Sequence, residues 1–264
     1  CLLKISKEDP TIVYHKNQAT DQLILSGMGE LHLEININRL QTEFGLKVNY
    51  GEPMINYRER FNYDMEITGK FDKQLGTQQL NAEVDFILTT SDQNKDNVNI
   101  ELNNRIQTAV ASWEKQAVQT FSDGLKHGGK WLCPINFVNV EIRAIRGDRG
   151  HTTDGAIAGA VLDGLRQAVE RGTTLLEPVM TLDIFTPEAM LEPIKNYLLC
   201  HRGVIGDICS LPNSKHLSCQ VPLSDTFKLG KELPQVSSGR AAFTMRPHSY
   251  QPVPEYLIEN IKTL

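Results

Sequence analysis

The sequence predicts an α+β protein made of three small α/β-sandwich domains. Its 264 residues are enough for two or three domains with their own cores. Strand-length and helix-length patterns alternate along the chain, which is typical of mixed layers of strands and helices. A break at Gly51–Pro53, and a change of pattern between Gly172 and Pro178, separate the patterns into three groups. We therefore expect domains at residues 1–51, 52–174 and 175–264.

The first group of patterns contains one amphipathic helix among short strands. Leu33, Ile37, Leu40 and Phe44 recur at helical spacing, and Gly45 follows as a C-cap. Runs at 11–14, 21–26 and 46–50 are expected to form strands around this helix. The order strand, strand, helix, strand indicates a small α+β layer.

The second group combines alternating strands with two helices. Residues 57–90 alternate between apolar and polar types, as strands of a hairpin meander do, and 91–99 form a polar tip. Apolar residues at helical spacing predict helices over 105–125 and 155–170. Between them lie a strand at 135–145 and a short polar loop at 146–154. We expect the loops to be exposed at one end of this domain.

The third group has the order of a split βαβ fold. Strands are expected at 179–186, 204–210, 217–221 and 241–245, with a helix from Pro187 to about His201 and a short helix after Ser224. The order β-α-β-β-α-β is the ferredoxin-like arrangement. We assign the same arrangement to the first domain.

Charge and cysteine content exclude several classes of protein. The net charge of −5 argues against a grip on nucleic acid over the whole surface, so any RNA contact should be local. No apolar run is long enough to span a membrane and the first residues do not form a signal peptide, so we expect a cytoplasmic protein without membrane contact. Five cysteines without a C-x-x-C pair favour buried free thiols over disulfides or a metal site.

Several sequence blocks resemble bacterial elongation factor G. The runs Glu8–Pro10, Gly27–Ile35 and Phe44–Pro53 are similar to the third domain of that family. Similarity to the family's fifth domain is found in five further runs, at residues 175–180, 186–188, 202–203, 239–245 and 250–254. The resemblance implies that the middle domain is the family's fourth, which has a β-α-β fold like that of ribosomal proteins and mimics a tRNA arm with its exposed tip loops.

The resemblance implies a translational GTPase that promotes translocation of tRNA and mRNA on the ribosome. Its partners would be the decoding region of the small subunit and the GTPase-centre RNA of the large subunit, with a GTPase domain in cis that uses GTP and Mg²⁺. The sequence contains no Gly-x4-Gly-Lys-Ser/Thr run, so the chain itself is expected neither to bind nor to hydrolyse GTP. It begins at Cys1, inside what resembles a domain, and we expect a monomeric piece of a longer protein. No catalytic or metal residue is predicted.

The loop between the strand at 135–145 and the following helix is the expected RNA contact. The resemblance places the family's tip histidine at His151 and a following acidic position at Asp154. Arginine side chains can pair with phosphates, and small polar residues expose backbone donors. A solvated connection is the alternative for such a loop. The expected contact residues are Arg146, Arg149, His151, Thr152, Thr153 and Asp154.

A second tip loop departs from the family pattern. The family has a Gly-rich segment with Arg and Tyr, whereas Lys73–Asn81 reads KQLGTQQLN. Close approach to RNA and a guanidinium contact are therefore not expected from this segment. The departure fits equally a paralogue of elongation factor G that acts in ribosome recycling, stress or ribosome protection. A standalone RNA- or protein-binding module without a GTPase domain is a further alternative.

A basic turn in the last domain is the second expected contact. His201, Arg202 and Gly203 align with an Arg-Arg-Gly turn that in the family lies near the large-subunit GTPase-centre RNA. The alternative is a helix C-cap in which Gly203 takes a positive φ, and both can hold together. We interpret His32 in the first helix as structural, because His32 and Glu34 point to different faces.

Overall fold

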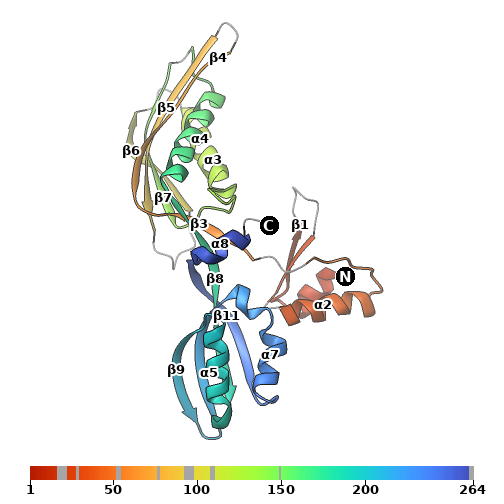
Figure 1. Ribbon diagram of the computed structural model, residues 1–264. Coiled ribbons are helices and arrows are strands. Elements are labelled where there is room, and N and C mark those ends of the chain that lie inside the picture. Colours follow the sequence, from red (N-terminus) through yellow and green to blue (C-terminus); the bar gives the residue numbers. More distant parts are fainter. Residues whose placement is uncertain are drawn as a thin grey trace. The chain divides into compact units, whose positions relative to one another are not determined.

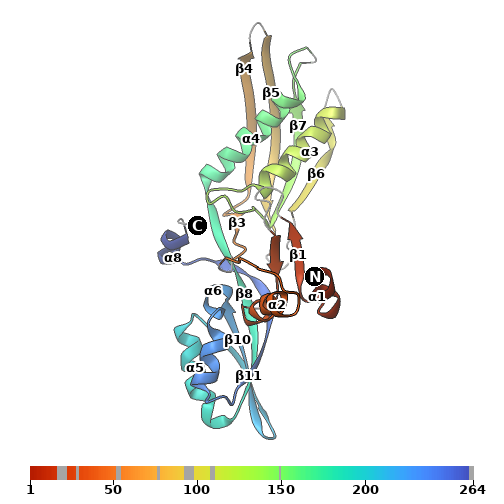
Figure 2. The same ribbon diagram turned by 90° about the vertical axis from the view of Figure 1, so that its right-hand side faces the viewer.

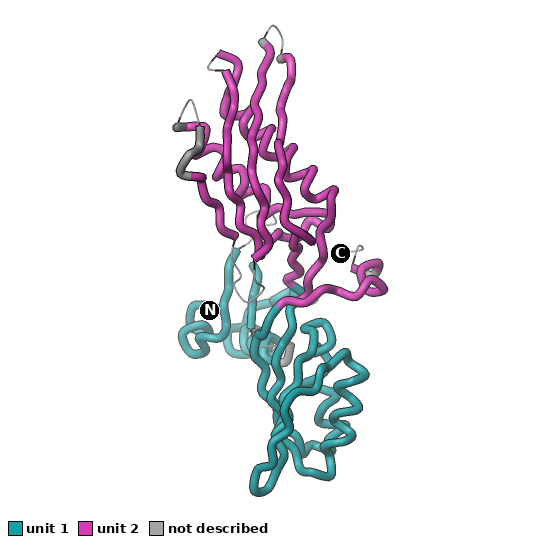
Figure 3. The backbone as a smooth tube through the Cα atoms, turned by 90° about the vertical axis from the view of Figure 1, so that its left-hand side faces the viewer, with its two compact units in different colours: residues 1–55, 178–249 teal, residues 56–177, 250–264 magenta. Residues whose placement is uncertain are grey.

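The computed structural model describes residues 1–16, 23–27, 30–51, 55–75, 78–91, 98–107, 111–148 and 150–261. The chain divides into two compact units, which Figure 3 shows in different colours. Unit 1 comprises residues 1–55 and 178–249, and unit 2 comprises residues 56–177 and 250–264. The division into three domains stays a prediction. Among the described residues, no helix is long and apolar enough to cross a membrane.

The N-terminal part of unit 1 is a hairpin with two helices. Helix α1 (Leu2–Glu8) precedes the antiparallel strands β1 (Val13–Lys16) and β2 (Leu23–Ser26), and α2 (Glu30–Thr42) follows. Ile5, Ile12 and Leu40 form its buried core. Because the apolar stripe of α2 turns toward this core, the predicted amphipathic helix is confirmed.

The strand predicted at 46–50 is wrong. These residues form no strand, and the chain instead continues around the end of α2. The Leu46 N–H donates to the Leu40 carbonyl at 3.1 Å, and Val48 packs against the small core. The apolar residues of this run are therefore used to close the helix end rather than to extend a sheet.

The remainder of unit 1 is an antiparallel sheet with helices on one face. Its strand order is β11-β8-β10-β9, and α5 and α7 lie against it (Figure 1). The buried side chains of β8 and β10 pack with those of α5 and α7. The confirmed order is ferredoxin-like, and β8 is the strand that continues from unit 2 into unit 1. The elements are β8 (Thr173–Thr186), α5 (Leu191–Cys200), β9 (Val204–Leu211), β10 (Ser214–Pro222), α6 (Leu223–Thr226), α7 (Leu229–Val236) and β11 (Ala242–Pro252), with a 3-10 turn at Glu188–Met190.

Unit 2 is a four-stranded sheet covered by two helices. The sheet has the order β4-β5-β7-β6, in which β6 is parallel to β7 and the other pairs are antiparallel. The short strand β3 pairs with the start of β8. The elements are β3 (Arg58–Phe61), β4 (Met65–Leu75), β5 (Gln78–Thr90), β6 (Val98–Gln107), α3 (Ala111–Lys126), β7 (Val138–Arg146), α4 (Asp154–Arg171) and α8 (Glu255–Ile261).

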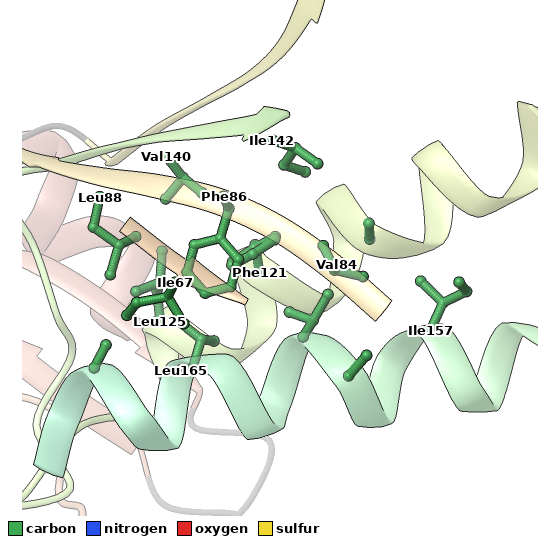
Figure 4. Close-up of a cluster of buried hydrophobic side chains, with 14 of the residues drawn as sticks. Ile67, Val84, Phe86, Leu88, Phe121, Leu125, Val140, Ile142, Ile157 and Leu165 are labelled. Atoms are coloured by element: carbon green, nitrogen blue, oxygen red, sulfur yellow. The ribbon is translucent and has the colours of Figure 1, made fainter. Parts of the chain in front are cut away.

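Helices α3 and α4 lie on the same face of this sheet (Figures 1 and 2). Figure 4 shows the core between the layers, where the Phe86 and Phe121 rings meet edge to face with centroids 4.8 Å apart. Ile157, Val161 and Leu165 of α4 point into this core, as their spacing predicted. The close packing of these layers supports the sheet along its length. One end of the sheet carries the loop between β7 and α4 and the ends of β4 and β5, which are the two segments of interest in the sequence.

The largest differences from the predicted element boundaries occur at three places. Arg105 belongs to β6, so α3 begins only at Ala111, because β6 continues its pairing with β7 to Gln107. Strand β8 begins before Pro178, at Thr173, because its first residues pair with β3. Strand β11 extends to Pro252, well past the expected end at Met245. The first two differences come from pairing between segments that are distant in sequence.

Candidate functional site

The loop between β7 and α4 is a tight turn that ends in a helix cap. The backbone N–H groups of His151 and Thr152 both donate to the Asp148 carbonyl at 2.8 Å. Thr153 is the N-cap of α4, and its hydroxyl accepts from the Ala156 N–H at 3.2 Å. Asp154 is the first residue of α4, where its negative charge interacts favourably with the helix dipole. Thr153 and Asp154 therefore have a structural role in addition to any contact role.

The β4–β5 hairpin holds this loop. The Thr152 hydroxyl donates to the Asn81 carbonyl at 2.7 Å and accepts from the Asp148 N–H at 2.9 Å. In the reverse direction, the Asn81 N–H donates to the His151 carbonyl at 3.2 Å. Thr152 is only 9% exposed. The two tip segments therefore form one hydrogen-bonded structure, which we call the paired tip: Gln79–Asn81 of β5 and Asp148 with His151–Asp154.

The ring of His151 is oriented by this contact. His151 Nδ1 lies 3.0 Å from the Gln79 carbonyl oxygen, and a carbonyl oxygen only accepts, so Nδ1 carries the hydrogen. In the neutral ring Nε2 is then an acceptor, and in the protonated ring it is a second donor. His151 is exposed, so the paired tip presents an oriented imidazole to solvent.

Gly147 is required where the chain enters this loop. A Cβ atom at this position would lie 2.2 Å from Thr152 Oγ1 and 2.8 Å from Thr152 Cβ. Gly150, in the same loop, has no atom within 4 Å of such a Cβ. The close approach of the backbone to Thr152 therefore explains the first glycine and not the second.

The arginine that ends β7 is already engaged with carboxylates. Arg146 hydrogen-bonds with Asp85, and its Nη1 lies 3.5 Å from Glu83 Oε2. The Asp85 carboxylate is the main cause that raises the pKa of Arg146. Arg146 is nevertheless more than half exposed, so it could turn to a phosphate only by exchanging one ion pair for another.

Some predicted positions lie outside the described residues. Arg149 is one of them, and Gly76 and Thr77 of the second tip segment are two others. The described part of Lys73–Asn81 consists of the ends of β4 and β5. Their backbone pairs in regular antiparallel register, with Lys73 opposite Leu80.

The second predicted contact, His201–Gly203, belongs to unit 1 and is the end of α5. His201 Nδ1 lies 2.8 Å from the Tyr197 carbonyl, and the centroids of the two rings are 4.3 Å apart. Arg202 Nε donates to Asp225 Oδ2 at 2.6 Å and Nη2 to Ser224 Oγ at 2.6 Å. The guanidinium is therefore held against α6.

The positive φ predicted for Gly203 is wrong. Arg202 takes the left-handed conformation, with φ at +53°, and Gly203 does not. The glycine is needed for a different reason, because a Cβ at 203 would lie 2.6 Å from the Leu198 carbonyl oxygen. The Gly203 N–H donates to this same oxygen at 2.8 Å, which closes the helix end.

The expectation of buried thiols is wrong for three of the five cysteines. Cys219 is buried and Cys133 is half-buried, whereas Cys1, Cys200 and Cys209 are exposed. All five are free. Within the described ranges, no group of three or more His, Cys, Asp or Glu side chains is placed to hold a metal ion.

His32 of α2 has a partner in the first turn of the chain after α1. His32 Nε2 lies 2.7 Å from Asp9 Oδ2, and Asp9 Oδ1 accepts from the Thr11 N–H at 3.0 Å. Hydrogen bonds from the Thr11 hydroxyl and then from His32 lower the pKa of Asp9 below its ordinary value of 3.8. These contacts connect α1 with α2.

We expect this contact to stabilise unit 1 in a pH-dependent way. A carboxyl whose pKa is lowered by folding contributes stability above its unfolded pKa and loses it as the pH falls through the folded value. Asp9→Asn should therefore destabilise the chain at pH 6, and the difference from wild type should shrink steadily as the pH falls below about 4. Urea unfolding followed by far-UV circular dichroism between pH 3 and 7 measures it. A difference that does not change with pH would contradict the assignment.

Sequence reasoning found the loop but not the residues that hold it. In the sequence, Gln79 and Asn81 only form part of a segment that departs from a family pattern, and they contribute mainly backbone atoms to the paired tip. A backbone acceptor can come from any residue type, so no side-chain signal predicted this role. The only indication in the sequence is that two polar segments lie at the ends of strands that could be neighbours.

Two families match separate parts of the chain. Residues 1–52 match the family described as Elongation Factor G, domain III, and residues 174–261 match Elongation factor G C-terminus. The elongation factor G of Cytophaga hutchinsonii is 31% identical over 265 residues, which covers 98% of this chain and 37% of that protein. The elongation factor G of Thermotoga maritima is also 31% identical, with 98% and 38% covered.

A solved structure shows the same likeness. A crystal structure of a protein from Thermus thermophilus matches 99% of this chain and 39% of its own chain, with a TM-score of 0.78 and 25% identity. The chain therefore spans well under half of the length of the relatives it matches.

Proposed function

Because the chain belongs to the elongation factor G family, we propose that it forms the ribosome-contacting part of a translational GTPase that promotes translocation of tRNA and mRNA. GTP and Mg²⁺ would act in a GTPase domain of the whole protein, and the protein would work as a monomer in the cytoplasm. Residues 1–51, 52–174 and 175–264 would correspond to domains three, four and five. The ribosomal partners would be the decoding region of the small subunit and the GTPase-centre RNA of the large one.

The paired tip is the observation that carries this proposal. His151 is exposed, its ring is oriented by the Gln79 carbonyl, and Thr152 anchors the loop to β5. Such an ordered polar end on a long sheet is suited to contacting RNA by shape and by hydrogen bonds to backbone and bases. Arg149, Arg146 and the turn at His201–Gly203 are further proposed contacts.

The test compares the whole protein with a double variant, His151→Ala with Arg149→Ala. Ribosome binding is measured by sedimentation with a non-hydrolysable GTP analogue, and translocation is measured on the same samples. We expect binding to persist and translocation to fall at least about tenfold, equivalent to about 1.4 kcal/mol in the barrier. The matched control is His127→Ala with Arg166→Ala, which removes one histidine and one exposed arginine elsewhere in unit 2.

The outcomes separate the proposed functions. If the double variant translocates as fast as the control, the paired tip does not contribute and the translocation proposal fails. If wild type binds ribosomes but moves no tRNA, a paralogue acting in recycling or ribosome protection is the better assignment. The departure of Lys73–Asn81 from the family's Gly-rich pattern fits that second candidate equally well. Absence of ribosome binding would favour a standalone RNA- or protein-binding module.

A further inference from the structure

The sheet of unit 2 has an outer face, which we define as the face opposite α3 and α4 (Figure 2). Alternate residues of β5 are buried in the core, and those between them, including Glu83 and Asp85, project from the outer face. Residues directly opposite each other in a sheet share a face, so the register also places Lys70 and Arg146 there, each opposite Glu83. Glu83 and Arg146 are close in sequence to the paired tip, so the outer face adjoins it.

Carboxylates outnumber cations on the described part of the outer face. The pairing registers and the ion pairs assign nine charged residues to it, which are the acids Glu66, Asp72, Glu83, Asp85, Glu101 and Glu141 and the cations Lys70, Arg143 and Arg146. This excess of negative charge is large beside the net charge of −5 of the whole chain. A surface with such a balance repels the phosphate backbone of RNA.

The cation nearest the paired tip, Arg146, is held by two carboxylates. Its guanidinium hydrogen-bonds with Asp85, and its Nη1 lies 3.5 Å from Glu83 Oε2. The other Asp85 oxygen, Oδ1, accepts from the Thr68 hydroxyl at 2.7 Å, which orients this carboxylate. The Asp85 side chain is 21% exposed and that of Arg146 is 56% exposed, so the acid is the more firmly held partner. A phosphate that approaches Arg146 must therefore compete with two carboxylates already in place.

The other two cations of the outer face also have carboxylate partners. Lys70 Nζ lies 3.5 Å from Glu83 Oε1. Arg143 Nη1 lies 3.4 Å from Glu66 Oε1, and its Nε lies 3.9 Å from Glu141 Oε1. Each cation on the described part of this face is therefore paired, and the excess charge that an approaching phosphate meets is negative.

We propose that Glu83 and Asp85 are specificity-determining residues, which withhold Arg146 from any RNA that the paired tip has not docked. Free RNA must displace both carboxylates and is repelled by the outer face, so it gains little from Arg146. A phosphate held beside Arg146 by contacts at the paired tip competes at a much higher effective concentration, so Arg146 can join a docked complex. This inference rests on the proposed function, because the docked partner is RNA.

The test measures binding of the 264-residue chain to a fluorescent oligouridylate of about 20 nucleotides by anisotropy. This single strand has no fixed shape for the paired tip to recognise. Glu83→Gln with Asp85→Asn keeps the size of both side chains and removes both charges. We expect this variant to bind the RNA at least about fivefold more tightly than wild type at low salt. The slope of log K against log salt should steepen by about 0.7, as expected for one additional phosphate contact on a single strand.

Two further variants separate the release of Arg146 from a general change of charge. Glu170→Gln with Glu259→Gln removes two charges from exposed positions on α4 and α8, and in the described part of the chain neither residue is paired with a cation. Its RNA binding should stay within about twofold of wild type. Arg146→Gln should change wild-type binding as little, but it should abolish the gain when added to Glu83→Gln with Asp85→Asn.

The proposal and the proposed function fail in different measurements. RNA binding by Glu83→Gln with Asp85→Asn no tighter than that of the control variant would overturn the proposal. An equal loss of binding on Arg146→Gln in both backgrounds would overturn it too, because Arg146 would then contact free RNA despite its carboxylates. Normal translocation by the tip variant would refute the translocation function alone, and the expected effects on RNA binding would still establish the role of Glu83 and Asp85.

Discussion

Replacing Glu59 with Ala should destabilise unit 2 by about 3–5 kcal/mol. Glu59 lies on β3 with no exposed surface, and its carboxylate accepts four hydrogen bonds. Three come from the backbone N–H groups of Lys130, Trp131 and Cys133, at 2.8, 2.9 and 3.2 Å. The fourth comes from the Thr173 hydroxyl at 2.9 Å. In the variant the buried Thr173 hydroxyl and the three part-buried N–H groups lose their acceptor, which is the costly case.

The variant is measured by urea unfolding followed by tryptophan fluorescence. Both tryptophans of the chain, Trp113 and Trp131, belong to unit 2, so the signal reports this unit alone. Glu66→Ala is the matched control, because the Glu66 side chain is 71% exposed and its ion pair with Arg143 is long, at 3.4 Å. The control should cost less than about 1 kcal/mol. A similarly small loss for Glu59→Ala would show that the carboxylate does not hold the 129–133 segment.

Glu59 also shows why long-range polar contacts escape prediction. The residues of β3 alternate between half-buried and buried positions. Glu59 occupies one of the buried positions, where an apolar residue is usual. Its four donors lie 71 to 114 residues away in the sequence. The pKa of the nearby Cys133 thiol is raised, first by burial and then by the Glu59 charge. Nothing local in the sequence indicates that three backbone N–H groups would converge on this carboxylate.

Helices were predictable to the extent that they carry a one-sided apolar stripe. The stripe Ile157, Val161 and Leu165 placed α4 to within one residue at each end, and all three side chains are buried. The start of β8 was not predictable, because it depends on pairing with a segment that is distant in sequence. Its first residues include the polar Thr173 and Glu177, and pairing with β3 extends the strand back to Thr173. The same limit applies to the site, where the loop was foreseen and the backbone of β5 that holds it was not.

Gly147→Ala should loosen the paired tip, while Gly150→Ala should leave it intact. The added methyl at 147 would overlap Thr152 Oγ1, and the backbone cannot yield without moving the hydroxyl away from the Asn81 carbonyl. Overpacking of this kind costs about 1–3 kcal/mol, which is enough to raise local opening by about fivefold or more. The Asn81 amide, which donates to the His151 carbonyl, should therefore exchange its hydrogen at least about fivefold faster.

The hydrogen-exchange rate of the Asn81 amide can be compared with the rate of translocation, to test whether the order of the loop matters for its proposed function. If the paired tip contacts RNA as a preformed surface, then loosening it lowers translocation without removing any contacting side chain, because the ordering of the loop must then occur on binding. We expect Gly147→Ala to reduce translocation by the whole protein at least about fivefold, in step with the exchange rate. Gly150→Ala, with open space around its Cβ, should match wild type in both measurements. Faster exchange with unchanged translocation would mean that the ribosome orders the loop itself and that the hydrogen bonds to β5 serve only the free protein.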